Sequence, residues 1–289
     1  MPASAPASRP AIVTLRSLLD RAAMEPAFLQ SGLEAAIVAL GPGSAGELAA
    51  ALAADAATCR GPAMARALGR LRSMDALPAM RELLKRPEAD ARRAGAAGLA
   101  CIACADSLAI LLDGLVDEST DVSRTAAESL VELEKSAPAL RVRAAVAQLA
   151  ERGRNVVARA RAIEVVVKLG GPDARSALER MLRDLEPDVR GAAVGALGTL
   201  GQASDAARAE LLEILESDRE PAVRKQAAIT LGRLKEKSAC PPLIEALSSD
   251  DSGLRANAYW ALKAISGRTF PLNSARWREW WQREGSRQP

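Results

Sequence analysis

One phrase of apolar and small residues recurs along the chain, and it constrains the fold more than any other feature. The phrase is clearest at residues 189–201, 223–234 and 254–262, and we call its first residue the anchor. Traced backwards at intervals of 31 to 36 residues, the phrase has anchors at Leu29, Arg60, Ala91, Val122, Ala158, Val189, Val223 and Leu254. A period of this length is typical of proteins built by stacking one small unit many times.

Each anchor begins a predicted helix that is apolar along one side. Four residues after the anchor the side chain is small or apolar in every copy. The residue eight positions after the anchor is always aliphatic: Ile37, Leu68, Leu99, Leu130, Val166, Leu197, Leu231 and Leu262. The residue eleven positions after it is also aliphatic: Leu40, Leu71, Ile102, Leu133, Leu169, Leu200, Leu234 and Ile265. Offsets of zero, four, eight and eleven lie on one face of an α-helix.

A first helix is predicted before each anchor helix. Apolar residues stand eleven and seven positions before the anchor, as in the pairs Met80 and Leu84, Leu111 and Leu115, Leu178 and Leu182, and Leu243 and Leu247. Prolines at positions 87, 187 and 221 break the chain between the two helices. Asp90, Asp121 and Asp188 precede their anchors directly and are predicted to cap the second helix. A lone helical hairpin cannot bury its apolar stripe, so the hairpins are expected to stack.

The composition excludes several kinds of chemistry. The 289 residues include 49% apolar but only 2% aromatic side chains, so the core must be aliphatic. With 39 basic and 36 acidic residues, the net charge is only +3, whereas a general binder of polyanions is usually more basic. The chain has no His, so Ser-His-Asp triads, Cys-His pairs and His-based zinc or di-iron sites cannot form within it. We expect no catalysis and no cofactor.

The phrase [VL]R-x2-A-x3-L-x2-[LI] at Val189, Val223 and Leu254 resembles the HEAT family, and more narrowly the short HEAT-like repeats first named for phycobilisome lyases. The resemblance spans residues 29–266, although Gln30 and Gly61 stand where Arg is expected. It implies an all-α protein, a right-handed α-solenoid of about eight HEAT-like hairpins. Tetratricopeptide and ankyrin repeats fit poorly, because the chain has one Tyr, two Phe and no His.

The ends of the chain differ from its middle. We expect a disordered tail at residues 1–10, the solenoid at 11–267, a C-terminal capping segment and helix at 268–285, and a short tail at 286–289. Trp277, Trp280 and Trp281 share one face of the last predicted helix, as in the endings of bacterial HEAT-repeat proteins. This helix is interpreted as a cap over the last repeat, with an aromatic docking patch as the alternative. No secretory signal and no membrane-spanning run is seen, so a cytoplasmic protein without membrane contact is expected.

The resemblance also implies that the second helices line a concave face. Their outward positions, at offsets two, six and ten, are predicted to bind the partner: Arg66, Arg70, Arg93, Arg124, Glu128, Glu132, Glu164, Lys168, Lys225, Arg233 and Trp260. Basic residues come first and acidic ones follow, with a floor of small residues at Gly191 and Gly195. A nucleic-acid track would stay basic along its length. Alternating signs favour a protein partner, and a merely solvated face is the alternative.

Two further motifs are interpreted as structural. Arg92, Arg159, Arg190, Arg224 and Arg255 each follow an anchor and are expected to pair with acidic groups and helix ends of adjacent repeats. Cys101 and Cys104 form a CxxC, with Cys101 expected on a helix and Cys104 just beyond its end. Without a second CxxC or any His, this pair predicts no metal site.

Three functions compete at this point. The leading hypothesis is a non-catalytic scaffold that binds a protein or peptide on the concave face. The second is nucleic-acid binding, as in the helical-repeat DNA glycosylases, suggested by the Arg-rich helices and Trp260. The third is a bilin lyase or pigment chaperone, which the resemblance alone suggests.

Overall fold

The computed structural model describes residues 14–25, 32–55, 60–71, 74 and 76–284, which are helices, turns and connecting segments with no strand among them. The chain divides into two compact units, residues 1–142 and 143–289, which are described separately. The predictions for the two terminal tails, for Leu29 and for Gln30 lie outside the described residues.

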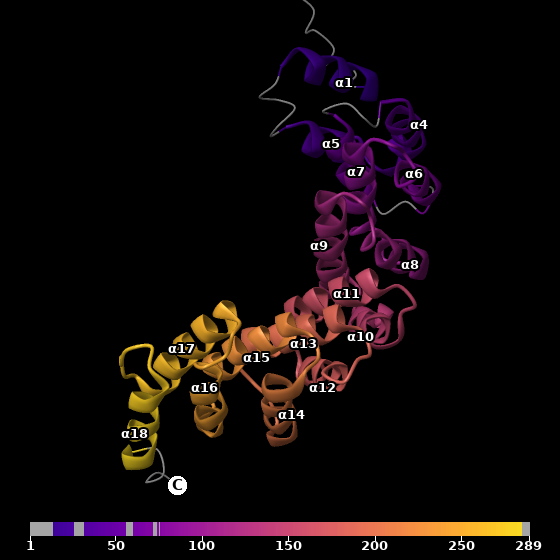
Figure 1. Cartoon of the computed structure of the whole chain (residues 1–289). Coiled ribbons are helices and arrows are strands. Elements are labelled where there is room, and N and C mark those ends of the chain that lie inside the picture. Colours follow the sequence, from indigo (N-terminus) through magenta and orange to yellow (C-terminus); the bar gives the residue numbers. More distant parts are fainter. Residues whose placement is uncertain (1–13, 26–31, 56–59, 72–73, 75, 285–289) are drawn as a thin grey trace, which may run out of the picture. The chain divides into compact units, whose positions relative to one another are not determined.

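Unit 1 (residues 1–142) is a stack of helical hairpins. It opens with α1 (Leu15–Met24) and α3 (Leu33–Ala39), and α3 packs on α5 of the next hairpin. The following hairpins are α4 (Ala45–Asp55) with α5 (Gly61–Arg70), α6 (Ala76–Leu83) with α7 (Ala89–Leu99), and α8 (Ala105–Gly114) with α9 (Thr120–Ser136). Figure 1 shows α5, α7 and α9 in one row and α4, α6 and α8 in another.

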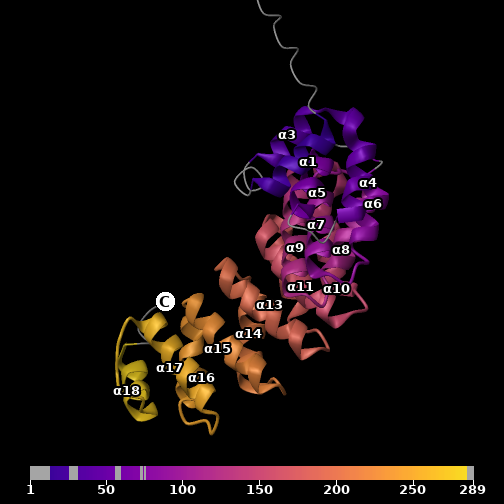
Figure 2. The same ribbon diagram turned by 90° about the horizontal axis from the view of Figure 1, so that it is seen from above.

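Unit 2 (residues 143–289) repeats this arrangement. Its hairpins are α10 (Val142–Arg152) with α11 (Val156–Leu169), α12 (Pro172–Met181) with α13 (Pro187–Leu200), α14 (Asp205–Ser217) with α15 (Pro221–Arg233), and α16 (Cys240–Ala246) with α17 (Ser252–Ser266). The second helices α11, α13, α15 and α17 pack on one another in succession, and Figure 2 shows the last three side by side. The predicted α-solenoid of about eight hairpins is confirmed.

The core lies where the repeat predicts it. Seven of the eight residues at offset eight are 0% exposed, and Val166 is 4% exposed. At offset four, Ala126, Ala162, Ala193, Ala227 and Ala258 are also buried, which lets consecutive second helices approach closely. The residues at offset eleven are mostly half-buried, because they lie at the last turn of each helix, where the next repeat covers less.

The second helices begin earlier than predicted, so the proposed caps are wrong. Asp90, Asp121 and Asp188 lie inside the first turn, and the N-cap positions belong to Glu88, Ser119 and Glu186. A carboxylate in the first turn still stabilises the helix through its dipole. A later repeat does have a capping aspartate: Asp251 accepts hydrogen bonds from the backbone N–H of Gly253 and Leu254 at 2.7 and 3.0 Å.

The C-terminal helix α18 (Ser274–Glu284) packs against α16 of the last repeat. Trp277 is fully buried there, with its ring edge-on to Phe270 at 4.9 Å and to Tyr259 at 6.2 Å. The Trp277 Nε1–H donates to the carbonyl of Pro271 at 3.1 Å. Helix α18 thus covers the last repeat as a cap. Trp280 and Trp281 are half-buried at the edge of the aromatic cluster.

Within the described segments, no single helix is both long and apolar enough to cross a membrane. The bent pair Leu33–Ala39 and Pro42–Leu52 passes that test by composition only, with a 108° bend at its break.

Two leucines of unit 2 test the packing directly. Leu197 on α13 is 0% exposed and Leu185 in the preceding turn is 94% exposed. Leu197→Ala is expected to lower the free energy of unfolding by about 2–5 kcal/mol, because it leaves a cavity in the stack. Leu185→Ala is the matched control, expected to change it by less than about 0.5 kcal/mol. Urea unfolding measures both, and equal stability of the two variants would contradict this packing.

Candidate partner-binding face

The outward surface of the second helices is here called the open face. Every predicted binding residue on it is exposed or half-buried. The structure places them in two groups, one in each unit. Unit 1 carries Arg66, Arg70, Arg93, Arg124, Glu128 and Glu132, and unit 2 carries Glu164, Lys168, Lys225, Arg233 and Trp260.

The four arginines of the open face in unit 1 are partly neutralised by carboxylates that the sequence analysis did not place on this face. Glu34 of α3 forms an ion pair with Arg66 at 2.8 Å and another with Arg70 at 2.9 Å. Arg93 pairs with Asp90 at 2.8 Å, and Arg124 pairs with Asp121. Such exposed pairs contribute little to stability, but they reduce the positive charge offered to a polyanion.

Other charges of the open face have no ion pair within the part of the chain that the structure describes. These exposed residues are Glu128 of α9, Glu164 and Lys168 of α11, and Arg233 of α15. Two of them, Glu128 and Glu164, are acidic, and the other two are basic. They are available to pair with groups of a second molecule.

A depression of about 480 Å³ lies on the open face between α13 and α15. Small residues, namely Gly191, Ala192 and Ala222, line this depression together with the acidic residues Asp188 and Glu220. Of the two glycines predicted as a floor of small residues, Gly191 lines this depression and Gly195 does not.

Trp260 of α17 is the largest exposed side chain of this face in unit 2. Its ring rests on Gly232 of α15, where a Cβ would lie 2.8 Å from the ring and 2.8 Å from the Cα of Ala261. One part of the indole is therefore held against the neighbouring helix, while 45% of the residue remains exposed. A side chain fixed in this way binds a partner with little loss of conformational entropy.

The first helices of unit 2 also carry paired charges. Arg180 of α12 pairs with Glu151 of α10, Arg183 in the turn after α12 with Glu210 of α14, and Arg208 of α14 with Glu236. Each of these pairs joins consecutive repeats. Charges on this side therefore connect consecutive repeats, as Arg66, Arg70 and Lys225 do on the open face.

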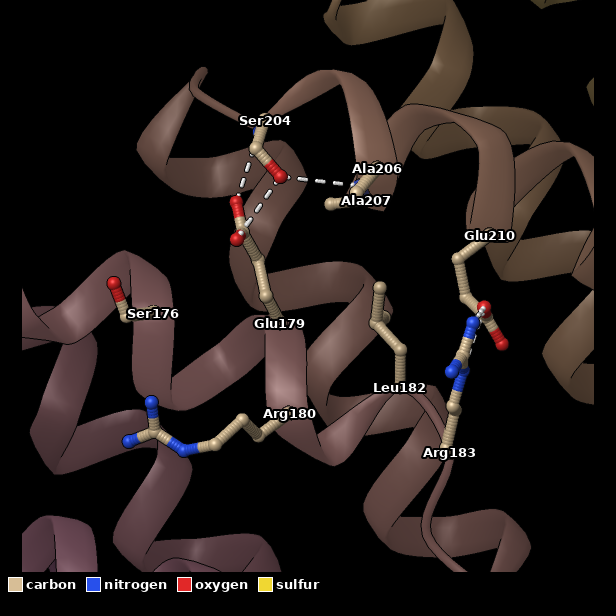
Figure 3. A pocket seen from close by; sticks show the side chains of 9 residues that line it. All are labelled: Ser176, Glu179, Arg180, Leu182, Arg183, Ser204, Ala206, Ala207 and Glu210. Atoms are coloured by element: carbon tan, nitrogen blue, oxygen red, sulfur yellow. Dashed lines mark hydrogen bonds and ion pairs between the residues drawn. The ribbon is translucent and has the colours of Figure 1, made fainter.

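A second depression, of about 470 Å³, lies between α12 and α14 (Figure 3). Its polar groups already have partners. Glu179 accepts hydrogen bonds from the backbone N–H and the hydroxyl of Ser204, at 2.8 and 3.0 Å. The Arg183 guanidinium points at Glu210, and Arg180 points away from both pairs toward Ser176.

The arginines that follow the anchors are structural in four of the five repeats. Arg92 reaches Asp117 at 2.8 Å, Arg190 reaches Asp218 at 2.8 Å, and Arg159 pairs with Asp184. In each case the carboxylate stands five residues before the next anchor, a regular spacing that the sequence analysis missed. Arg255 donates to the carbonyls of Ser249 and Asp250 at 2.6 and 2.9 Å.

Arg224 is the exception. Ser249 stands where its carboxylate partner would be, five residues before Leu254. The Arg224 Nε is buried, and it has no hydrogen-bond partner in the described part of the chain. The prediction that Arg224 pairs with an acidic group of the next repeat is therefore wrong, because that group is missing from the sequence.

The Arg190–Asp218 pair illustrates the energetics of this contact. Burial alone would raise the pKa of Asp218, but hydrogen bonds from Arg190 and from the Glu220 backbone N–H outweigh it and lower the pKa. The same hydrogen bond raises the pKa of Arg190. Two further Arg190 donations, to the carbonyls of Asp184 and Leu185, fix the turn between α12 and α13.

The three described cysteines, Cys101, Cys104 and Cys240, belong to no group that could hold a metal ion. Cys101 lies in the turn after α7, rather than on the helix as expected, and Cys104 is the N-cap of α8, with its sulfur 3.4 Å from the Ser107 backbone nitrogen. Burial raises the pKa of the Cys240 thiol to about 12. No group of metal-ligating side chains occurs among the residues described, which do not include Cys59.

Sequence profiles of known families decide the family. The HEAT-repeat profile matches residues 47–132, 142–209 and 208–271, which together exceed half of the chain. The chain belongs to the HEAT-repeat family. A search of curated proteins found no match to the chain.

Several solved structures share the repeat fold at low sequence identity. Human deoxyhypusine hydroxylase is 22% identical, covering 82% of this chain and 89% of its own, with a TM-score of 0.38. The YibA protein of Escherichia coli is 21% identical, covering 78% of this chain and 88% of its own, with a TM-score of 0.45. A designed armadillo repeat protein in complex with the peptide (KR)4 is 20% identical, covering 65% of this chain and 99% of its own, with a TM-score of 0.41. These likenesses concern the fold alone.

The lowered pKa of Asp218 makes a prediction about pH. A carboxylate whose folded pKa lies below its unfolded value, about 3.9, stabilises the fold above that value and loses this effect as the pH falls through the folded pKa. Asp218→Asn is therefore expected to cost about 1–3 kcal/mol near pH 7, and progressively less below about pH 4.

Chemical unfolding at several pH values measures this difference. Asp205→Asn, at an exposed aspartate of α14 that has no ion pair within the described segments, is the control. A cost of Asp218→Asn that stays constant or grows on acidification would contradict the assignment.

Proposed function

We propose that this HEAT-repeat protein is a non-catalytic scaffold that binds a protein or peptide partner on its open face. The observation that supports this most is a set of outward charges on the open face that have no ion pair among the described residues. These are Glu128, Glu164, Lys168 and Arg233. Trp260 adds an exposed aromatic side chain of the type that dominates protein interfaces.

The mixture of charges favours a protein over a nucleic acid. Four arginines of unit 1 are matched by three carboxylates close by, and Glu128 and Glu132 follow on the same helix as Arg124. Nucleic-acid affinity depends on cations that neutralise successive phosphates. Alternating signs instead set the register and the choice of a protein partner.

Two charge reversals test the open face. Glu128→Lys in unit 1 and Glu164→Lys in unit 2 are expected to release a partner that the wild-type chain captures from its native host. Exposed surface changes of this kind shift stability by only about 0.5 kcal/mol, so loss of binding reports the interface. Quantitative mass spectrometry of the captured proteins measures the loss.

Matched controls lie on the first helices. Glu47→Lys on α4 and Asp173→Lys on α12 reverse exposed carboxylates of the same two units, and they are expected to leave capture unchanged. The proposal is wrong if the captured proteins are lost with the controls and kept with the open-face variants, or if duplex DNA binds instead in a salt-dependent way.

A further inference from the structure

Helices α15 and α17 of the open face carry positive charges and no negative charge, as α5 also does in unit 1. Residues 221–233 and 252–266 contain five arginines or lysines and no aspartate or glutamate. This is unusual in a chain with almost equal numbers of basic and acidic residues. The two helices pack directly on each other, so their outward surfaces form one continuous patch.

Three of the five cations are engaged away from the centre of this patch. Lys225 pairs with Asp251 at 3.2 Å, and Arg255 donates to two backbone carbonyls. Arg224 lies near Asp218, whose pKa its charge helps to lower. Arg233 and Lys263 remain. Both are exposed, and neither forms an ion pair with any described residue. The Lys263 ammonium lies over the ring of Tyr259, 5.5 Å from its centroid.

The nearby carboxylates are already occupied. Asp251 caps α17 at its other end and pairs with Lys225. Glu236, in the turn after α15, accepts from Arg208 and from the Ser238 hydroxyl, which hold its pKa below the ordinary value despite its burial. Lys235, beside it, is exposed and has no ion pair in the described structure. Arg233, Lys235 and Lys263 thus place three positive charges without an ion pair among the described residues at this end of the two helices.

An apolar surface lies between these cations. Trp260 rests on Gly232, the residue immediately before Arg233, and Lys263 follows one helical turn after Trp260. Ile229 is half-buried at the same offset of α15 that Trp260 occupies on α17. The patch thus combines an aliphatic and an aromatic side chain with cations on both helices. We call Ile229, Arg233, Lys235, Trp260 and Lys263 the basic–aromatic patch.

We propose that the basic–aromatic patch binds a short acidic segment of a partner protein, with an apolar side chain of that segment against Trp260 and Ile229 and its carboxylates on Arg233, Lys235 and Lys263. Charge complementarity selects the acidic residues, and the indole held on Gly232 selects the apolar one. This inference rests on the proposed function and specifies the chemistry of the partner.

Peptide arrays on the full chain test this chemistry. One array moves Leu, Ile, Phe or Trp through a background of Asp and Glu, a second uses a background of Lys and Arg, and a third replaces the apolar residue with Ser. The first array is expected to bind, the second to fail, and the third to bind much more weakly. Fluorescence polarisation of the best peptide should show an affinity that falls with added salt, because exposed charges are screened.

Variants locate the site. The double change Arg233→Glu and Lys263→Glu is expected to weaken binding of the best peptide by at least about tenfold, and Trp260→Ala by a similar factor. Trp260 also packs on α15, so the exposed charge pair keeps the test valid if Trp260→Ala fails to fold. Lys85→Glu in unit 1 applies the same type of charge reversal outside the patch and should leave affinity unchanged.

Several results would overturn the inference. These are no binding by any acidic peptide, equal or tighter binding of the basic array, tighter binding of duplex DNA than of the best peptide, or undiminished binding by the double variant. One result would refute only this chemistry and leave the scaffold function intact. In that result the Glu128→Lys or Glu164→Lys variant releases a captured partner, but the wild-type chain binds the basic array rather than the acidic one.

Discussion

The fold depends on the packing of one second helix on the next. The residues at offsets four and eight carry this contact, and nearly all of them have no exposed surface. Small side chains such as Ala193 and Ala227 bring the helix axes close, and the leucines four residues later fill the space between them. Burial of aliphatic surface must supply the stability, since the chain has few aromatic residues to contribute. A hairpin separated from its neighbours would expose this stripe, so the repeats are stable only as a stack.

This packing also determines what is left for function. Because the stripe faces neighbouring helices, offsets two, six and ten turn outward, and their chemistry is free to vary without cost to the core. Near the turns, Arg183 and Arg190 pair with carboxylates of the next repeat. In the proposed function, a partner would therefore meet the depression between α13 and α15, the unpaired charges and one positioned indole.

Much of this could be predicted from the sequence, because helical periodicity reports burial directly. All residues at offset eight were predicted to be buried, and the structure confirms this from Ile37 to Leu262. The outward positions were predicted for the same reason. The helix starts were not, because Asp90 and Asp121 are good caps in isolation, but the chain enters the helix two residues earlier.

Partners distant in sequence were harder to predict. The sequence of a single repeat does not predict that Glu34 pairs with both Arg66 and Arg70, because these contacts join helices of two different repeats. The aspartates that receive Arg92, Arg159 and Arg190 did leave a signal, since each stands five residues before the next anchor, and comparison of anchors would have found it. Where that position is Ser249, Arg224 loses its partner. Hydrogen–deuterium exchange of the free chain tests the central claim most directly. The account predicts the slowest exchange in second helices packed on both sides, such as α7, α13 and α15, and faster exchange in the first helices; first helices that exchange as slowly as, or more slowly than, these would contradict it.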